Sequence, residues 1–107
     1  MGVTRGEVYL ANFDPTVGNE VGKPRPCLVI SPDEMNLKAG TFIAVPLSSK
    51  HKPYMSRVNC EFRGRPAQAQ LDQIRPMSPL RIIAKLGQLD EPSLHRVLDR
   101  LQEMFAI

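Results

Sequence analysis

Short runs of strand-forming residues, each closed by turn residues, recur along most of the chain. These runs predict β-strands at residues 7–13, 26–30, 41–47, 57–62 and 67–71. In the first run, Val8 and Leu10 are expected on one face of the strand. Tyr9 and Phe13 are expected on the opposite face, because successive side chains alternate.

Proline and glycine mark where the runs break. Pro46, inside the run 41–47, predicts an edge strand or a bulge, because proline cannot donate a hydrogen bond to a neighbouring strand. Residues 34–39 are expected to form one helical turn that Gly40 ends. Residues 17–24 and 48–55 are expected to be loops, 63–66 a hairpin connection and 72–79 irregular, whereas 80–89 fit a short helix or a strand.

The clearest predicted element lies near the end of the chain. Asp90 is expected to cap a helix there, with Glu91 and Pro92 in its first turn. Apolar residues recur at helical spacing after this cap, namely Leu94, Val97, Leu98, Leu101, Met104 and Phe105. The whole pattern predicts a mainly β fold, a strongly bent sheet or half-open barrel, with a C-terminal helix packed on it.

Length and composition fit this picture. With 107 residues, of which 42% are apolar, the chain is expected to form one domain spanning residues 1–107. Ten prolines argue against a helical bundle. Cys27 and Cys60 lie in apolar strand-like runs and are expected to be buried free thiols.

Charge and hydropathy bear on where the protein is located in the cell but do not indicate its function. The formal net charge of +3 is compatible with nucleic acid, and equally with proteins that never bind it. No segment approaches the roughly 18 consecutive apolar residues of a membrane span, and the N-terminal residues lack an apolar signal core. We therefore expect a cytoplasmic protein with no membrane association.

No metal or cofactor site is expected from the sequence. His51 and His95 are the only histidines and fall in different predicted elements, and no zinc, phosphate-loop or nucleophile-elbow motif occurs. The remaining candidates for chemistry are polar loops at strand ends. Arg25 lies between two prolines, and hydroxyls and cations gather in Ser48-Ser49-Lys50-His51-Lys52. Taken alone, each loop is better explained as an ordinary solvated turn.

Taken together, these segments resemble the MazF/PemK/Kid family of toxins. The similarity runs through Arg5–Leu10, Phe13–Glu20, Arg25–Pro32, Val45–Ser49 and Leu71–Arg75, and ends with Leu86-Gly87 before the amphipathic helix. The resemblance implies an SH3-like barrel, usually a homodimer. It also implies metal-independent, sequence-specific cleavage of single-stranded mRNA, and an antitoxin partner whose acidic, disordered tail covers the active site.

The resemblance also implies roles for individual residues. Arg25 matches an arginine that contacts the scissile phosphate, and Ser48 stands where family members carry a catalytic threonine. Glu20 matches an acidic loop residue, and Asp72 matches an aspartate proposed as a base, so either could remove the proton from the 2′-hydroxyl. The substrate-binding candidates are Asn19, Lys23, Ser49, Lys50, His51, Lys52, Arg57, Gln70 and Gln73.

One departure from the family pattern affects the expected mechanism. Some members carry an arginine where this chain has Gln70, so the acid role of that arginine cannot be transferred. Either Arg25 must then also take the acid role, or His51 must contribute to it. Two alternatives from other classes remain at this point: a CcdB-like poison of DNA gyrase, and a non-catalytic nucleic-acid-binding barrel.

Overall fold

The computed structural model describes residues 2–13 and 23–107. The described residues form seven strands: β1 (Glu7–Ala11), β2 (Arg25–Val29), β3 (Phe42–Ser48), β4 (Arg57–Phe62), β5 (Arg65–Gln70), β6 (Arg75–Met77) and β7 (Ile82–Gln88). They are joined by the helices α1 (Asp33–Lys38) and α2 (Glu91–Phe105) and by the short 3-10 helices η1 (Leu71–Gln73) and η2 (Pro79–Arg81). The predicted mainly β architecture with a C-terminal helix is confirmed.

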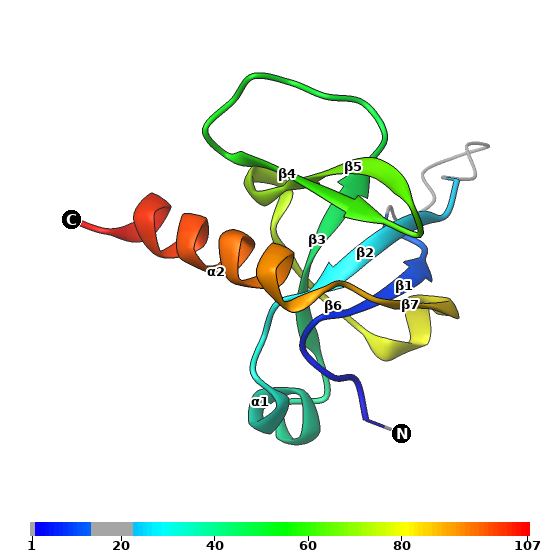
Figure 1. The fold of residues 1–107 in the computed structure, drawn as a ribbon. Helices are drawn as coiled ribbons and strands as arrows, with labels where there is room; N and C mark the ends of the chain where they lie inside the picture. The colour runs from blue at the N-terminus through cyan, green and yellow to red at the C-terminus, as the bar shows by residue number, and fades with distance from the viewer. Residues whose placement is uncertain (1, 14–22) are drawn as a thin grey trace, which may run out of the picture.

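The strands form one antiparallel, strongly bent sheet (Figure 1). Its order is β4-β5-β3-β2-β1-β7, and β6 pairs with β3. Apolar clusters cover both faces of the sheet. Val8 belongs to the cluster that also contains Val97 and Leu101 of α2, whereas Tyr9 and Phe13 belong to the other cluster. The two predicted faces of the first strand are therefore confirmed, except that Leu10 is only half-buried.

The expectation that Pro46 marks an edge strand or a bulge is wrong. β3 lies inside the sheet, and Pro46 is in regular register with Cys27 of β2. On the other side of β3, pairing with β6 ends at Ala44 and pairing with β5 begins at Leu47. Pro46 thus falls where β3 changes partners, so its missing N–H group interrupts no ladder.

The β4–β5 hairpin is tighter than predicted. Phe62 and Arg65 are register partners, so only Arg63 and Gly64 form the turn. Both have positive φ angles, 55° and 74°, as a type I′ turn requires. β5 therefore begins at Arg65, two residues before the predicted start at residue 67.

The hairpin end lies against β7 and brings the two outer strands of the sheet together. The Arg63 guanidinium donates a hydrogen bond to the carbonyl oxygen of Leu86. A side chain at Gly87 would meet the Phe62 ring at 3.4 Å, and Gly87 has a φ angle of 151°. The φ angle favours glycine here, and the nearby Phe62 ring leaves little room beyond a Cβ atom. The contact between the hairpin and β7 curls the sheet toward a barrel.

α2 begins and packs as the sequence predicts. The Asp90 carboxylate accepts a hydrogen bond from the Ser93 amide at 2.9 Å, and Val97 and Leu101 are buried. Phe105 was expected on the apolar face but is 68% exposed, because it is the last residue of the helix and extends past the sheet. Neither α1 nor α2 is long and apolar enough to cross a membrane, and these are the α-helices of the described residues.

The two cysteines are buried free thiols, as expected. Burial raises the pKa of the Cys27 thiol to about 11 and also raises that of Cys60. Both side chains therefore stay protonated near neutral pH and contribute to packing.

Candidate active site

Polar side chains from four neighbouring strands form a row across one end of the sheet. Ser48 of β3 and Asn59 of β4 are both register partners of Gln68 in β5. Continuing the β2–β3 register of Cys27 with Pro46 by two residues places Arg25 opposite Ser48. Because opposed residues of antiparallel strands share a face, the sheet itself places Arg25, Ser48 and Gln68 next to one another on one face.

A cavity of about 380 Å³ opens at this site. Its lining residues are Arg25, Pro26, Leu47, Ser48, Ser49, Lys50 and Gln70. Among these residues Arg25 and Lys50 are the charged ones, and both are exposed. A cavity with two cations and two hydroxyls suits an anion, and the guanidinium fork of Arg25 matches the oxygens of a phosphate.

Ser48 is fixed at the wall of the cavity with its hydroxyl proton still available. Its Oγ atom accepts a hydrogen bond from the Lys50 amide at 3.0 Å. A serine hydroxyl has one donor hydrogen besides its acceptor lone pairs, so Ser48 can still donate to a bound oxygen. This geometry suits a residue that hydrogen-bonds a phosphate oxygen.

The loop after Ser48 is tied to β5 by Gln68, which the sequence analysis did not single out. The loop that joins β3 to β4 arches away from the sheet (Figure 1). The Gln68 side chain is 2% exposed, and it bonds both backbone polar groups of Lys52 in this loop. The sequence signal was a lone glutamine between two alanines of a strand, which does not reveal its partner.

Asp72 forms an ion-pair cluster outside the cavity. Its carboxylate accepts hydrogen bonds from Arg57 at 2.6 and 3.0 Å, from Ser56 at 3.1 Å and from Gln73 at 3.3 Å. Arg57 first, then these smaller contacts, hold the pKa of the Asp72 carboxyl well below its usual range. The Arg57 guanidinium also lies 5.4 Å from the centre of the Tyr54 ring.

The structure thus divides the predicted site residues into groups. Arg25, Ser48, Ser49, Lys50 and Gln70 line the cavity, whereas Arg57, Asp72 and Gln73 gather in the ion-pair cluster. His51 and Lys52 are exposed in the loop after Ser48, and Lys23 is exposed just before β2. Asn19 and Glu20 lie outside the described residues.

A smaller cavity of about 140 Å³ adjoins the first. It shares Pro26, Leu47, Ser48 and Ser49 with the larger cavity and adds Phe62, Arg65, Pro66 and Ala67. Its added walls are mostly apolar and come from the β4–β5 hairpin. The larger cavity thus carries Arg25 and Lys50, whereas the smaller one adds mostly apolar walls and one further cation, Arg65.

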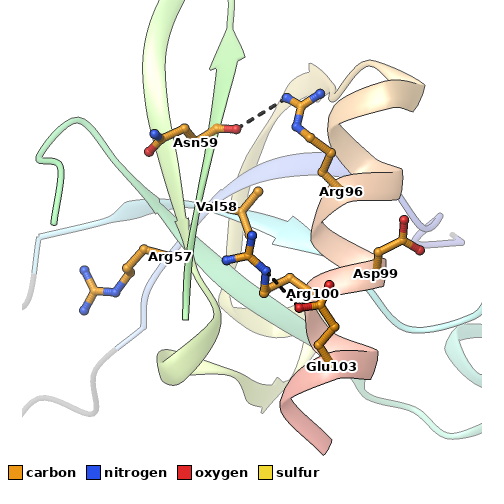
Figure 2. A pocket seen from close by; sticks show the side chains of 7 residues that line it. All are labelled: Arg57, Val58, Asn59, Arg96, Asp99, Arg100 and Glu103. Atoms are coloured by element: carbon orange, nitrogen blue, oxygen red, sulfur yellow. Dashed lines mark hydrogen bonds and ion pairs between the residues drawn. The ribbon is translucent and has the colours of Figure 1, made fainter. Parts of the chain in front are cut away.

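A third cavity, of about 430 Å³, lies between β4 and α2 (Figure 2). Its arginines are engaged within the protein: Arg96 donates to the Asn59 carbonyl at 3.4 Å and Arg100 to the Met55 carbonyl at 2.6 Å. Figure 2 shows the Arg57 guanidinium turned away from the helix, consistent with its pairing to Asp72. These contacts fasten α2 to the sheet.

The described residues contain no group of three or more histidine, cysteine, aspartate or glutamate side chains that could hold a metal ion. His51 lies in the loop after β3, and His95 lies on α2.

Comparisons with known proteins agree with the fold. The chain is 32% identical to Endoribonuclease EndoA of Bacillus subtilis, over 98% of this chain and 96% of that protein. It is 33% identical to Endoribonuclease toxin MazF of Escherichia coli, over 68% of this chain and 66% of that protein. A crystal structure of MazE-MazF from Deinococcus radiodurans has a TM-score of 0.84 and 26% identity, covering 100% of this chain and 98% of that chain.

A family model matches nearly the whole chain. The model describes PemK-like, MazF-like toxins of type II toxin-antitoxin systems, and it matches residues 4–105. The matched range includes every strand, both α-helices and the cavity that contains Arg25 and Ser48. The chain therefore belongs to the family of PemK-like, MazF-like toxins of type II toxin-antitoxin systems.

Proposed function

We propose that this chain is the toxin of a type II toxin-antitoxin system and a sequence-specific endoribonuclease that cleaves single-stranded mRNA in the cytoplasm. Cutting messages would inhibit translation and growth. Relatives named as endoribonucleases support this proposal over a gyrase poison or a non-catalytic barrel. The observation that carries it is the cationic cavity in which Arg25 and Ser48 meet.

The proposed reaction uses the 2′-hydroxyl of the RNA as nucleophile. This oxygen attacks the adjacent phosphorus, the bond to the 5′ oxygen breaks, and a 2′,3′-cyclic phosphate forms. The ribose holds the nucleophile close to the phosphorus, so the protein need not supply one. Its tasks are to orient the phosphate, to stabilise the phosphorane charge and to move two protons.

Arg25 and Ser48 are assigned to the phosphate. The Arg25 guanidinium stabilises the charge that develops on the nonbridging oxygens, and the Ser48 hydroxyl donates to one of them. Protonation of the leaving 5′ oxygen falls to Arg25, acting through water, or to His51 from the neighbouring loop. Gln70, where some relatives carry arginine, can donate a hydrogen bond but cannot act as an acid.

Glu20 is the better candidate for the base. A base near neutral pH must accept a proton readily, whereas the Asp72 carboxylate is stabilised in its charged form by Arg57. We therefore assign proton removal to Glu20. Arg57 and Gln73, which bond the same carboxylate, are expected to fix η1 beside the site rather than bind the RNA strand.

The remaining predicted residues are assigned to the RNA strand. Lys50 lines the cavity and Lys23 and Lys52 are exposed near it, so their charges suit phosphates on either side of the cleaved bond. Asn19 and Ser49 are assigned to hydrogen bonds with the substrate. The adjoining 140 Å³ cavity, with Phe62 and Pro66, offers apolar walls for a neighbouring base.

The proposal includes two protein partners. A crystal structure of MazE-MazF from Deinococcus radiodurans resembles this chain over its full length, which supports an antitoxin partner. The family resemblance implies that this antitoxin has an acidic, disordered tail. The exposed cations Arg25 and Lys50 would attract such a tail. We also assign a homodimer as the active form, with no membrane association.

The test is an RNA cleavage assay. Purified protein is incubated with single-stranded RNA, and the 5′ ends of the fragments are sequenced to find the cleavage motif. Arg25→Ala is expected to reduce fragment yield at least about 100-fold, the range seen when a stabilising donor is removed from an active site. Because Arg25 is exposed at a strand end, the melting temperature of the Arg25→Ala protein should stay near that of the wild type.

Lys38→Ala is the matched control. It also removes one exposed cation, but on α1 outside the cavity, where Lys38 pairs only with Glu34 at 3.2 Å. Cleavage should be unchanged in this variant. An Arg25→Ala protein that cuts at the wild-type rate would remove Arg25 from the mechanism.

A further inference from the structure

We propose that Gln68 is a positioning residue for RNA cleavage, which holds the loop after β3 so that Ser48 and Lys50 face the bound phosphate. This inference rests on the proposed function. It concerns a side chain that does not line the cavity and does not touch the reacting atoms. Three observations support the inference: the three hydrogen bonds of Gln68, its nearly complete burial and its register position in β5.

Gln68 makes a two-point contact with one loop residue. Its Oε1 atom accepts from the Lys52 amide at 3.0 Å, and its Nε2 atom donates to the Lys52 carbonyl at 2.9 Å. The same Nε2 atom donates to Oδ1 of Asn59 at 2.9 Å. Both amide hydrogens are thus used, and the pair of bonds to Lys52 imitates the pairing of two residues in a β-ladder.

This contact fixes the segment that carries the cavity residues. Gln68 is the register partner of Ser48, so the segment Ser48–Lys52 leaves β3 and returns to the same position of β5. Within it, the Lys50 amide donates to Ser48 Oγ at 3.0 Å. The segment is held at Ser48 by the sheet, at Lys52 by Gln68 and in between by this turn.

The amide of Gln68 is buried, and its hydrogen bonds offset the cost of that burial. Its chain neighbours Ala67 and Ala69 point to the opposite face of β5 and belong to the apolar cluster there, whereas the register partners of Gln68 are Ser48 and Asn59. A buried amide costs free energy unless its hydrogen bonds are made, and those of Gln68 go to Lys52 and Asn59. Removing the amide should therefore release the loop and leave the sheet intact.

The test compares Gln68→Leu, Ser48→Ala and the double variant in steady-state cleavage. We expect Gln68→Leu to lower kcat about 10- to 100-fold, because small displacements of a catalytic group have effects of this size. KM should change much less than kcat, since the exposed lysines are still present. Amide hydrogen exchange at Lys52 should accelerate in Gln68→Leu while the exchange of sheet amides stays slow.

The double variant separates positioning from a general structural role. If Gln68 acts through Ser48, adding Gln68→Leu to Ser48→Ala should lower kcat little further, because coupled residues are not additive. If the fold-loss in kcat of the double variant equals the product of the two single losses, the proposal is overturned. A Gln68→Leu protein with wild-type kcat would also overturn it.

Two measures keep the test decisive. If Gln68→Leu does not fold, Gln68→Asn replaces it, because this side chain keeps the amide but is one methylene too short to reach Lys52. If the wild type cuts no RNA, the proposed function fails, while Lys52 exchange still tests the loop contact by itself. Wild-type cleavage with no effect of either Gln68 variant would instead reject the positioning role alone.

Discussion

Asp72 illustrates how a motif residue can be chemically unsuited to the role that its family suggests. Both carboxylate oxygens accept hydrogen bonds from Arg57, and Ser56 and Gln73 add further donors. Each of these donors stabilises the charged form and lowers the basicity of the group. The local geometry therefore favours a structural role, which a sequence motif alone could not separate from a catalytic one.

Asp72→Asn tests this assignment through stability and activity together. Because the pKa of Asp72 is lowered in the folded protein, its stabilisation is present above the unfolded value of about 3.9 and is lost as the pH falls below it. We expect Asp72→Asn to lower the free energy of unfolding at pH 7 by no more than about 1 kcal/mol, since the pair is partly exposed to solvent. The difference from wild type should shrink as the pH falls below about 3.9 and should vanish only once the pH falls below the lowered pKa of the folded protein.

The corresponding activity measurement is the pH dependence of cleavage between pH 5 and 9. If Asp72 is structural, Asp72→Asn should keep the shape of the wild-type profile, with at most a modest loss of rate. Glu20→Gln serves as the comparison, and we expect it to remove the acidic limb of the profile, where the rate rises with pH as the base loses its proton. Loss of that limb in Asp72→Asn instead would identify Asp72 as the base.

The sequence predicted Arg25 and Ser48 through family motifs, and the strand register explains why those motifs meet. It did not predict the role of Gln68. Spacing along β5 shows on which face a side chain lies, but not which backbone group of a distant loop it will bond. The same limit applies to the Arg57–Asp72 pair, whose members are distant in sequence.

At the scale of elements, agreement with the sequence follows the strength of the local signal. β4 spans the predicted residues 57–62, and α2 begins at the predicted cap. β6 was missed because its three residues form a strand only by pairing with β3. The segment 80–89 could not be assigned from its sequence, and pairing with β1 makes most of it the strand β7.

Gly87→Ala tests the contact between the β4–β5 hairpin and β7. We expect a loss of about 1–3 kcal/mol in the free energy of unfolding, because alanine disfavours the φ angle of 151° and would press on the Phe62 ring. Gly40→Ala is the control, since Gly40 also has a positive φ of 71° but open space around it. Urea unfolding should show the larger loss for Gly87→Ala, and equal losses would mean that the ring contact adds nothing.

Leu101→Ala tests the packing of α2 on the sheet. Leu101 is buried in the apolar cluster with Val97, so we expect a loss of about 2–5 kcal/mol, and Leu101→Asp should unfold or aggregate the protein. Phe105→Ser is the control on the same helix, because Phe105 is exposed. Thermal unfolding should leave Phe105→Ser near wild type, whereas an unchanged melting temperature for Leu101→Ala would show that this face of α2 is not a core face.

For the molecule as a whole, the apolar clusters and the cavity have separate locations. The clusters on the two faces of the sheet hold the fold together, while the cavity lies where β2 begins and β3 and β5 end. Catalytic substitutions there should therefore affect activity more than stability. This separation allows tests of the whole reaction to be made on a folded protein.

Cleavage should survive excess EDTA. The sequence contains no recognisable metal-binding motif, and the proposed steps are carried by Arg25, Ser48 and the substrate's own hydroxyl. The measurement is the initial rate with and without chelator at constant ionic strength, because salt alone weakens RNA binding. Loss of activity on chelation that a divalent ion restores would reject the metal-independent mechanism.

A single 2′-deoxy nucleotide on the 5′ side of the cleaved bond should stop cutting and barely weaken binding. The substitution deletes the proposed nucleophile but leaves the phosphate for Arg25 and the nearby lysines to bind, and charge contacts with the backbone do not need that hydroxyl. Matched oligonucleotides, one all-ribose and one with the deoxy position, are compared for fragment yield on a gel and for affinity. Mass spectrometry of the all-ribose products should find a 2′,3′-cyclic phosphate and a 5′-hydroxyl. Cleavage of the deoxy oligonucleotide at the same bond would mean that water or a side chain attacks the phosphorus instead.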